Sequence, residues 1–341
     1  MGYPEDMQVV DSLGRSLRAL RVSVTDRCNF RCPYCMPRER FGGRHDFLDR
    51  SQILTFEEIE RLVRLFVGLG VEKIRLTGGE PLLRQELPTL VARLRKIEGL
   101  RELTLTTNGT LLETLAQPLR EAGLDRITVS LDSLDPARFL ALSDSNIGLE
   151  RVLAGLQAAQ AAGFGPIKLN CVLQRGVNEA DILPLAEFAR EQGHILRFIE
   201  FMDVGTGNGW KLDRVVPAAE VVQVLATRWP LESFQRDCPN CVAQHFRYTD
   251  GQGDVGLIAS VTEPFCQGCD RARLSAEGKL YTCLFASEGL DLRAFLRSKA
   301  TDADLLAVVL NRWRRRDDRY SERRAENTHS GPRVEMFHIG G

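Results

Sequence analysis

Six of the nine cysteines in this chain form two triplets, one near each end of the sequence. The spacings are C-x3-C-x2-C and C-x2-C-x13-C, and the residues are Cys28, Cys32, Cys35, Cys266, Cys269 and Cys283. Three thiolates can hold a cluster of four irons and four sulfides, which leaves one iron open to another ligand. An open iron can bind a small molecule as well as carry electrons. The two triplets therefore predict two clusters that each hold a small molecule.

Zinc and disulfide bonds are the alternatives for these cysteines. Structural zinc takes four ligands, but the first triplet contains no histidine, and His45 lies ten residues further on. A zinc ribbon could combine the CxxC pairs at 238–241 and 266–269. However, the 24 residues between them exceed the usual spacing of about 15–20, and Cys283 would be left unused. The odd number of cysteines, their tight spacing and the lack of an export signal disfavour disulfides. Iron–sulfur binding is the favoured interpretation.

The composition is that of a globular protein without a general affinity for polyanions. The chain has 341 residues, of which 43% are apolar and 27% charged, enough for one large or two ordinary domains. Its net charge of −1 argues against binding to nucleic acid or acidic membranes. No apolar run approaches the length of a membrane-spanning helix. The N-terminal residues lack the apolar core of a signal peptide, so we expect a cytoplasmic location.

Six apolar, β-rich runs alternate with amphipathic helical patterns over the first two thirds of the chain. The runs cover residues 18–25, 73–77, 102–107, 126–131, 167–173 and 196–201. The helical pattern at 55–70 opens with Thr55 and Glu58 at capping-box spacing and stops at Gly70. Six β/α units predict an α/β fold, a partial (βα)6 TIM-like barrel, because a closed barrel needs eight units. We expect the reacting groups at the carboxyl ends of its strands.

The pattern changes after about residue 230, where short apolar runs, glycine-rich turns and two CxxC pairs replace the alternation. We therefore expect two domains, a barrel over residues 1–230 and an irregular C-terminal module over 231–341 that carries the second cluster. The charged stretch at 312–324 has a helical pattern.

The first triplet and several short motifs resemble the radical S-adenosylmethionine (SAM) superfamily. The motifs TGGEP (77–81), TTNG (106–109), VSLDS (129–133) and IEFMD (199–203) each end or follow a predicted strand. The resemblance implies that the first triplet binds a [4Fe–4S] cluster whose open iron binds SAM and whose electron cleaves SAM to a 5′-deoxyadenosyl radical. The glycines of TGGEP would let backbone groups approach SAM closely. The resemblance implies SAM contacts at Tyr34, Gly79, Ser130 and Met202, although a core methionine would explain Met202 equally well.

The second triplet resembles the family of radical SAM enzymes that cyclise GTP at the start of molybdenum cofactor biosynthesis. The resemblance covers nearly the whole chain and includes IRLTGGEPLLR, RFIEFMDVG, GLIASVTEPFC, DDRYSERR and the terminal Gly340-Gly341. It implies a second [4Fe–4S] cluster that binds the guanine of GTP. Implied substrate contacts are Arg21, Arg75, Thr106, Lys168, Arg197, Arg271 and Arg273. Lys73 is a further candidate because it lies two residues before Arg75 on the same strand face.

The resemblance also implies a reaction, in which the radical takes the 3′-hydrogen of GTP and C3′ then attacks guanine C8. A further electron and proton would give 3′,8-cyclo-7,8-dihydro-GTP, so the resemblance implies a carbon–carbon bond-forming lyase. The terminal glycines would enter the active site, whereas a frayed end is the ordinary state of a terminus. The expected catalytic residues are Arg21, Arg271, Arg273, Gly340 and Gly341. Expected partners are GTP, a second copy of the chain, a reducing protein and a downstream enzyme that forms cyclic pyranopterin.

Some features stay outside this interpretation. We expect Cys171 to be a buried thiol, while the pair at 238–241 could be free, a labile disulfide or a zinc site across a dimer. The segment 141–150 lacks the Gly-Arg-rich loop often found in the family. A different radical SAM enzyme would need more C-terminal cysteines and would give Arg271 and Arg273 no role. A zinc-dependent nucleic-acid binder would need a basic surface, which the net charge does not offer.

Overall fold

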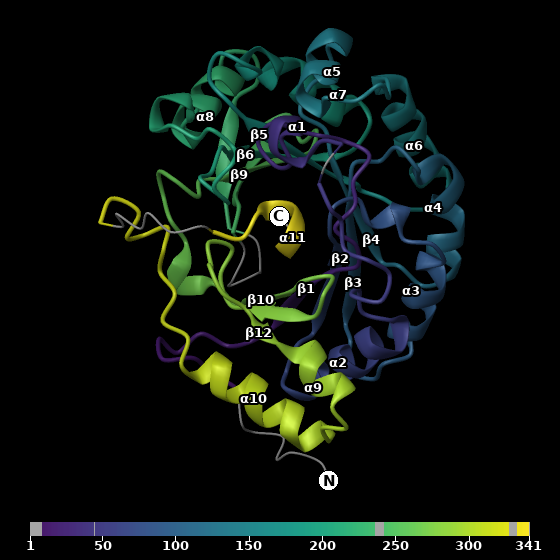
Figure 1. The fold of residues 1–341 in the computed structure, drawn as a ribbon. Helices are drawn as coiled ribbons and strands as arrows, with labels where there is room; N and C mark the ends of the chain where they lie inside the picture. The colour runs from purple at the N-terminus through teal and green to yellow at the C-terminus, as the bar shows by residue number, and fades with distance from the viewer. Residues whose placement is uncertain (1–8, 44, 236–241, 327–332, 341) are drawn as a thin grey trace.

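In the part of the chain that the structure describes, the strands form one continuous twelve-stranded sheet, in the order β12-β11-β10-β1-β2-β3-β4-β5-β6-β9-β8-β7. The computed structural model describes residues 9–43, 45–235, 242–326 and 333–340. The strands of the first two thirds are β1 (Ala19–Ser23), β2 (Lys73–Thr77), β3 (Glu102–Thr107), β4 (Arg126–Ser130), β5 (Lys168–Leu173) and β6 (Ile195–Glu200). The six predicted strands are therefore confirmed, to within two residues at their ends. The sheet curves into a partial barrel, as Figure 1 shows.

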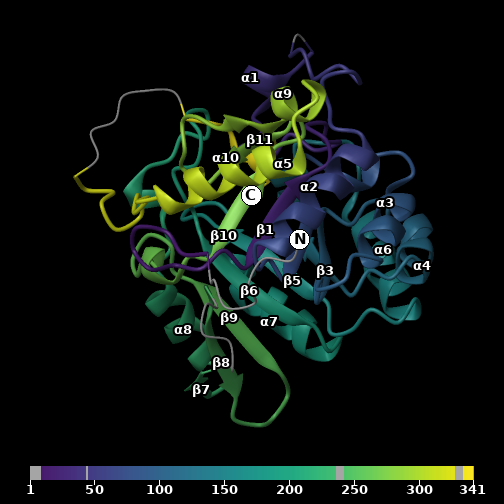
Figure 2. The same ribbon diagram turned by 90° about the horizontal axis from the view of Figure 1, so that it is seen from below.

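The C-terminal third extends this same sheet at both edges. Its strands are β7 (Leu231–Phe234), β8 (Gln244–Tyr248), β9 (Asp254–Ile258), β10 (Arg271–Leu274), β11 (Lys279–Tyr281) and β12 (Leu290–Asp291). β10 pairs in parallel with β1, and β9 pairs in parallel with β6, so eight neighbouring strands run in one direction. β7 and β8 form an antiparallel hairpin beyond β9 (Figure 2). The domain boundary at residue 230 stays a prediction, because residues on both sides of it build one sheet.

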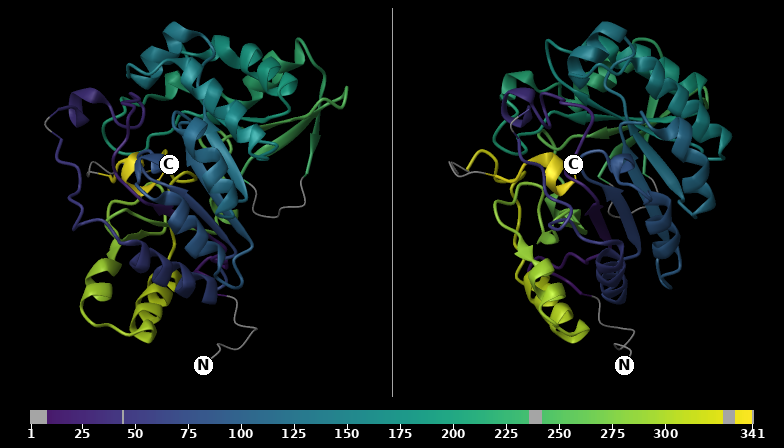
Figure 3. Two further views of the ribbon diagram at one scale, coloured as in Figure 1. Left: turned by 90° about the vertical axis from the view of Figure 1, so that its right-hand side faces the viewer. Right: turned by 45° about the vertical axis from the view of Figure 1, so that its right-hand side comes forward.

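Helices cover the convex face of the sheet (Figures 1 and 3). Those that alternate with the strands are α2 (Phe56–Gly68), α3 (Leu87–Arg95), α4 (Leu112–Glu121), α5 (Pro136–Ser143), α6 (Leu149–Ala161), α7 (Ile182–Glu191) and α8 (Ala218–Ala226). The remaining α-helices are α1 (Arg38–Phe41), α9 (Leu292–Arg297), α10 (Asp302–Arg314) and α11 (Met336–Ile339). The predicted capping box is present, since Thr55 accepts from the Glu58 backbone and the Glu58 side chain accepts from the Thr55 backbone. It fixes the start of α2.

The strands alternate between an apolar outer face and a polar inner face. Outward residues such as Leu20, Ile74 and Leu103 are fully buried beneath the helices in one large core. Inward residues on the neighbouring positions include Arg21 and Arg75, which are opposite each other across β1 and β2. Period-two alternation is the expected pattern for strands with one face against a core. Here it leaves the inner face of the barrel free to carry charge.

The helix expected at 312–324 is only partly present, so this prediction was wrong beyond its first turn. α10 ends at Arg314, and turns replace the helix after it. The side chain of Arg316 is buried and donates hydrogen bonds from Nη1 and Nη2 to the carbonyl oxygen and Sγ of Cys269. A periodic pattern of charge predicts a solvated helix, but this arginine is directed into the protein instead.

We predict that Gly155→Ala lowers the free energy of unfolding by about 1–3 kcal/mol, the usual cost of overpacking. Gly155 lies in α6 where that helix crosses α4, and a Cβ there would overlap the carbonyl oxygen of Gly109. Gly68 is the matched control, because it is exposed at the end of α2 with nothing near its Cβ position. Gly68→Ala should leave stability unchanged or raise it by up to about 1 kcal/mol. Urea unfolding followed by circular dichroism measures both, and equal effects would contradict this packing argument.

Candidate active site

Two cavities adjoin inside the barrel. The first encloses about 1180 Å³ of empty space and the second about 1020 Å³, in both cases including solvent at the mouth. Both are large enough for a nucleotide-sized molecule. Four residues line both cavities, namely Thr106, Asn170, Ile199 and Met202. Molecules bound in the two cavities would therefore lie against the same side chains.

The first cysteine triplet lines the first cavity. Cys28, Cys32 and Cys35 follow β1 on the loop at the carboxyl end of the sheet, and each is partly buried. The loop is tightened by hydrogen bonds from the backbone N–H groups of Cys35 and Met36 to the carbonyl oxygen of Cys32, both of 2.9 Å. The three cysteines of the first triplet thus line one cavity, and their role as cluster ligands stays a prediction.

The arrangement of the cysteines suits a cluster better than a single ion. Within the described ranges, no three Cys, His, Asp or Glu side chains are placed to hold one metal ion. A zinc site requires its ligands to converge at about 2.3 Å from one atom. A four-iron cluster separates its thiolates, because each thiolate binds a different iron. Three cysteines that face one cavity without meeting at a point fit such a cluster.

The four predicted SAM contacts Tyr34, Gly79, Ser130 and Met202 all line the first cavity. The glycine of this set has a structural explanation that the sequence did not suggest. A Cβ on Gly79 would overlap the backbone of Arg27, which passes directly against the TGGEP turn. Glycine is therefore required where the loops after β1 and β2 cross, whatever the cavity holds.

Sequence reasoning missed two buried carboxylates of the first cavity, although both lie inside the strand-end motifs. Glu80 accepts hydrogen bonds from the Thr107 hydroxyl at 2.6 Å and the Asn108 backbone at 2.7 Å. Asp132 accepts from the Tyr34 hydroxyl at 2.7 Å and the Val172 backbone at 2.8 Å. Burial raises the pKa of Glu80 to about 7 and that of Asp132 to about 6. Buried carboxylates favour a cationic guest, which would keep them ionised.

The second cavity has the opposite charge. Its cationic lining residues are Arg21, Arg75, Arg197, Arg271 and Arg273. The strand register sets three of them side by side, because Arg273 on β10 pairs with Arg21 on β1, which pairs with Arg75 on β2. Burial and neighbouring positive charges lower the pKa of Arg75 and of Arg273 to about 10. Crowding of buried like charges is unfavourable, so an anion bound here would be strongly stabilised.

Neighbouring side chains orient these arginines. Nη1 of Arg75 donates to the Thr106 hydroxyl at 2.9 Å and to the Thr128 hydroxyl at 3.1 Å. Nε of Arg197 donates to Oδ1 of Asn170 at 3.0 Å. Thr106, a predicted substrate contact, thus lies in the wall shared by both cavities and also positions an arginine.

The two predicted lysine contacts line neither cavity. Lys73 and Lys168 sit at the first positions of β2 and β5, on the inner face and nearer the amino ends of the strands. Nζ of Lys73 pairs with Glu102 at 2.6 Å. Burial, together with Arg75 for Lys73 and Arg197 for Lys168, lowers their pKa values to about 7 and about 6. They form a second layer of basic groups behind the arginines.

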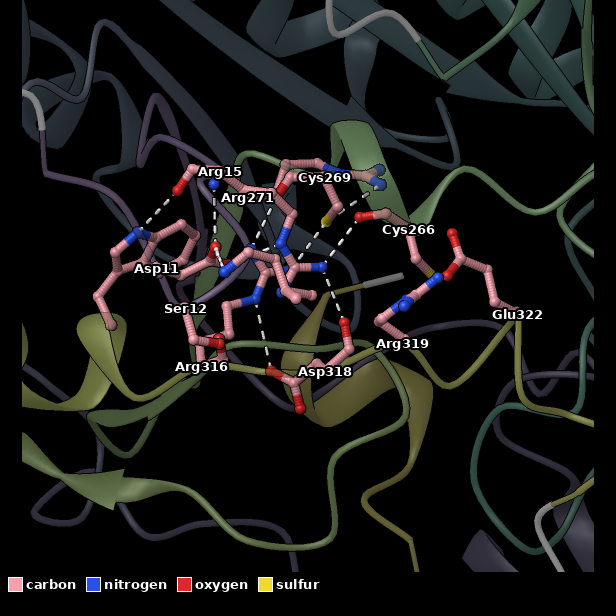
Figure 4. Close-up of polar contacts among 12 residues, drawn as sticks. Asp11, Ser12, Arg15, Cys266, Cys269, Arg271, Arg316, Asp318, Arg319 and Glu322 are labelled. Atoms are coloured by element: carbon pink, nitrogen blue, oxygen red, sulfur yellow. Dashed lines mark hydrogen bonds and ion pairs between the residues drawn. The ribbon is translucent and has the colours of Figure 1, made fainter.

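The second triplet, Cys266, Cys269 and Cys283, lines the second cavity. Its position corrects the expectation that all reacting groups lie at the carboxyl ends of strands, because Cys269 stands just before β10, beside the amino end of β1. Figure 4 shows the arginines around it. Burial raises the pKa of Cys269, but the charges of Arg271 and Arg316 outweigh burial and hold this pKa at about 6. The second site thus favours thiolate at Cys269.

The C-terminal segment lies inside the barrel, where α11 sits within the curve of the sheet (Figure 1). The carbonyl oxygen of Gly340 accepts hydrogen bonds from Nη1 of Arg21, at 3.3 Å, and from Nη1 of Arg273. Gly340 has a φ of +70°, and a Cβ there would overlap the Thr77 side chain. Gly341 lies outside the described residues, so the prediction for it stays a prediction.

Of the three remaining cysteines, the structure describes Cys171. Cys171 is completely buried on β5, and its Sγ lies 3.7 Å from the Asp132 carbonyl oxygen, which confirms the expected buried thiol. Cys238 and Cys241 lie outside the described residues. In the part of the chain that is described, no helix has the length and apolarity to cross a membrane.

A cysteine triplet after the first strand of a partial barrel, beside a cavity with strand-end motifs, defines a radical SAM protein. The radical SAM superfamily model matches residues 22–189, and a second family model, Molybdenum Cofactor Synthesis C, matches residues 194–322. The solved structure of Streptococcus suis SuiB bound to S-adenosylmethionine shares the fold, with a TM-score of 0.57 at 14% identity over 87% of this chain and 64% of that one.

Full-length relatives identify the family. The chain is 54% identical to the GTP 3′,8-cyclase of Acidothermus cellulolyticus over 97% of this chain and 98% of that protein. It is 44% identical to the GTP 3′,8-cyclase of Staphylococcus carnosus over 98% of this chain and 99% of that protein. The chain belongs to the GTP 3′,8-cyclase family.

We predict that anaerobic reconstitution loads about eight irons per chain and that Cys266→Ala removes about four of them, since each cubic cluster holds four. Cys171→Ala is the control, because this buried thiol lines neither cavity, and it should keep all the iron. Iron, sulfide and zinc analysis checks the result. Zinc in place of iron, or iron unchanged in Cys266→Ala, would refute the assignment of the second triplet.

Proposed function

We propose that this protein cyclises GTP to 3′,8-cyclo-7,8-dihydro-GTP, the first step of molybdenum cofactor biosynthesis, by joining ribose C3′ to guanine C8. The observation that carries the proposal is the pair of adjoining cavities, each lined by three cysteines and opposite in charge. Buried carboxylates in the first suit SAM, which is a cation at its sulfonium and ammonium groups. Buried and half-buried arginines in the second suit the triphosphate of GTP.

Each triplet would hold one [4Fe–4S] cluster, the first on Cys28, Cys32 and Cys35 and the second on Cys266, Cys269 and Cys283. When bound, the first cluster and SAM supply the 5′-deoxyadenosyl radical that removes the 3′-hydrogen of GTP. The chain's own contribution is to bind, orient and enclose the reactants.

The first cavity would bind SAM through Tyr34, Gly79, Ser130 and Met202. Glu80 and Asp132 add buried acceptors on the same wall. Because Tyr34 donates its hydroxyl to Asp132, this carboxylate also fixes the loop that carries the cysteines. An ordered loop would hold SAM at a fixed distance from the GTP in the second cavity. Such positioning of two reactants supplies much of the rate acceleration in enzymes.

The second cavity would bind GTP with the guanine toward the second triplet. Arg21, Arg75, Arg197, Arg271 and Arg273 are the predicted contacts, and Thr106 lies between the two guests. Lys73 and Lys168 would extend the basic surface toward the amino ends of the strands. Their pKa values near neutrality mean that an anion would draw protons onto both amines as it binds.

The tail supplies the last part of the site. The Gly340 carbonyl oxygen contacts both Arg21 and Arg273, so it holds two of the expected catalytic arginines in one orientation. The proposed catalytic set consists of Arg21, Arg271, Arg273, Gly340 and Gly341. A tail folded into the barrel also closes it against water, which would otherwise quench reactive intermediates.

The wider setting is proposed on the same basis. Residues 1–230 would form the radical-generating unit and residues 231–341 the GTP-binding unit. A homodimer, a reducing protein that supplies electrons and a downstream enzyme that forms cyclic pyranopterin are the proposed partners. The proposed location is the cytoplasm, with no nucleic acid or membrane bound.

The deciding experiment incubates the anaerobically reconstituted protein with SAM, dithionite and GTP deuterated at C3′. We expect 5′-deoxyadenosine and the cyclised nucleotide in equal amounts, with the deuterium transferred to 5′-deoxyadenosine. ATP is the control substrate and should give no cyclised product. Mass spectrometry measures both products. Formation of 5′-deoxyadenosine without deuterium, or without a cyclised nucleotide, would reject the proposal.

We predict that Gly340→Ala abolishes cyclisation while both clusters stay in place. The added methyl group would overlap Thr77, and the positive φ disfavours any side chain, so the tail would leave Arg21 and Arg273. Gly253→Ala is the control, since Gly253 has a φ of +96° but nothing within contact distance of its Cβ position. Product formation and iron content are the measurements. Normal turnover in Gly340→Ala would show that the tail is dispensable.

A further inference from the structure

Arg316 is a buried cation that touches the second cysteine triplet but lines neither cavity. Its side chain is 1% exposed. Nη2 donates to Sγ of Cys269 at 3.1 Å, and Nη1 donates to the carbonyl oxygen of the same residue at 2.7 Å (Figure 4). One guanidinium thus holds both the sulfur and the backbone of a cluster cysteine. Substrate binding gives Arg316 no role, because it does not line either cavity.

A second layer of residues fixes the guanidinium of Arg316. Oδ2 of Asp11 lies 3.5 Å from Nη1, and Oδ2 of Asp318 lies 3.4 Å from Nε. The Trp313 ring packs against the guanidinium with its centroid 4.6 Å from Cζ. A planar guanidinium with a carboxylate on each of two edges and an aromatic ring on its face has one orientation. The remaining edge faces Cys269.

The same network reaches the other cysteine of the CxxC pair. Nε of Arg15 pairs with Oδ2 of Asp11 at 2.6 Å, and Nη1 of Arg15 donates to the carbonyl oxygen of Cys266 at 2.9 Å. Asp11 therefore joins two arginines that each hold the backbone of one cysteine. The 266–269 loop is therefore held by two segments that are far apart in the sequence. Arg15 of the N-terminal segment bonds to Cys266, and Arg316 of the turn after α10 bonds to Cys269.

The first triplet also has an arginine beside it, but that arginine contacts the backbone and not a sulfur, since Nη1 of Arg31 donates to the carbonyl oxygen of Cys28 at 2.7 Å. In the described part of the chain, the hydrogen bond to Cys28 Sγ comes from the backbone N–H of Phe30, at 3.4 Å, and no arginine or lysine side chain donates to a sulfur of that triplet. Its charged neighbours in the cavity wall are the carboxylates Glu80 and Asp132. The two cysteine sites thus differ in their surroundings as well as in their guests.

Hydrogen bonds to cluster sulfurs and buried positive charge both stabilise the reduced state of an iron–sulfur cluster, since reduction makes it more negative. An N–H group that donates directly to the thiolate acts at the shortest range. Asp11 and Asp318 offset the charge of the guanidinium from its far edges, so the hydrogen bond to sulfur is the dominant contribution.

We propose that Arg316, oriented by Asp11, is a positioning residue of the second cluster. Arg316 fixes the Cys269 ligand and raises the reduction potential of the cluster. The inference rests on the proposed function only in assigning a cluster to the second triplet. It does not depend on which substrate that cluster binds.

The test isolates the second cluster by replacing Cys28, Cys32 and Cys35 with alanine. In this background we compare Arg316→Gln, Arg316→Lys and the control Arg315→Gln, an exposed arginine one residue away with the same change in charge. Redox titration followed by electron paramagnetic resonance measures the potential. Arg316→Gln should make reduction at least about tenfold less favourable, about 59 mV for one electron. Arg316→Lys should fall between it and the unchanged control.

The other possible outcomes also either support or overturn the role of Arg316. A potential in Arg316→Gln equal to that of the control would overturn it. If Arg316→Gln loses the second cluster, the otherwise intact chain with this substitution is analysed for iron. Retention of about four irons, those of the first cluster, would support the role at Cys269, whereas loss of both clusters would show a general structural role and overturn it.

Asp11→Glu supplies an independent variant, because it keeps the negative charge beside Arg316 but displaces the carboxylate that orients it. It should lower the potential less than Arg316→Gln does, and no shift at all would contradict the orienting role of Asp11. The two proposals can fail separately. If the unmodified protein does not cyclise GTP but the variants still shift the reduction potential, the proposed function is rejected and the role of Arg316 is supported.

Discussion

The parallel pairing of β10 with β1 is the contact on which the rest of the structure depends. It attaches one of the two edges that the C-terminal third adds to the barrel sheet, and it sets Arg273 beside Arg21 in register. It also brings Cys269 to the amino end of β1, while Cys28 follows the carboxyl end of the same strand. One strand therefore separates the two cysteine triplets and determines that their cavities meet inside the barrel. A shift of one residue in this register would turn the arginines of β10 toward the core.

Charge separation divides the interior into two sites. The carboxylates Glu80 and Asp132 lie with the first triplet, and the arginines of β1, β2, β6 and β10 lie with the second. The carboxylates and Arg273 are buried and the other arginines are half-buried, so each set favours a ligand of opposite charge. Recognition of the two reactants therefore depends on where the strands place their inward residues.

Segments far apart in sequence complete both sites. The tail enters the barrel to contact Arg21 and Arg273, and the N-terminal segment around Asp11 reaches the 266–269 loop through Arg15 and Arg316. Both ends of the described chain thus act on the arginine-rich cavity or its cysteines. Such long-range contacts order loops that would otherwise have few contacts to hold them in one conformation. They also make the geometry of the site depend on the stability of the barrel.

The sequence by itself determined the features that depend on near neighbours. The strand limits, the capping box of Thr55 and Glu58 and the grouping of the first cysteines all follow from local spacing, and the structure agrees with each. Three features were decided only by the tertiary structure. Residues after 230 extend the barrel sheet. Lys73 and Lys168 lie outside the arginine-lined cavity, and Arg316, expected in an exposed helix, donates a hydrogen bond to Cys269. The physical reason is that register and burial are set by contacts between distant segments, such as the 47 positions that separate Cys269 from Arg316, and no local pattern encodes them.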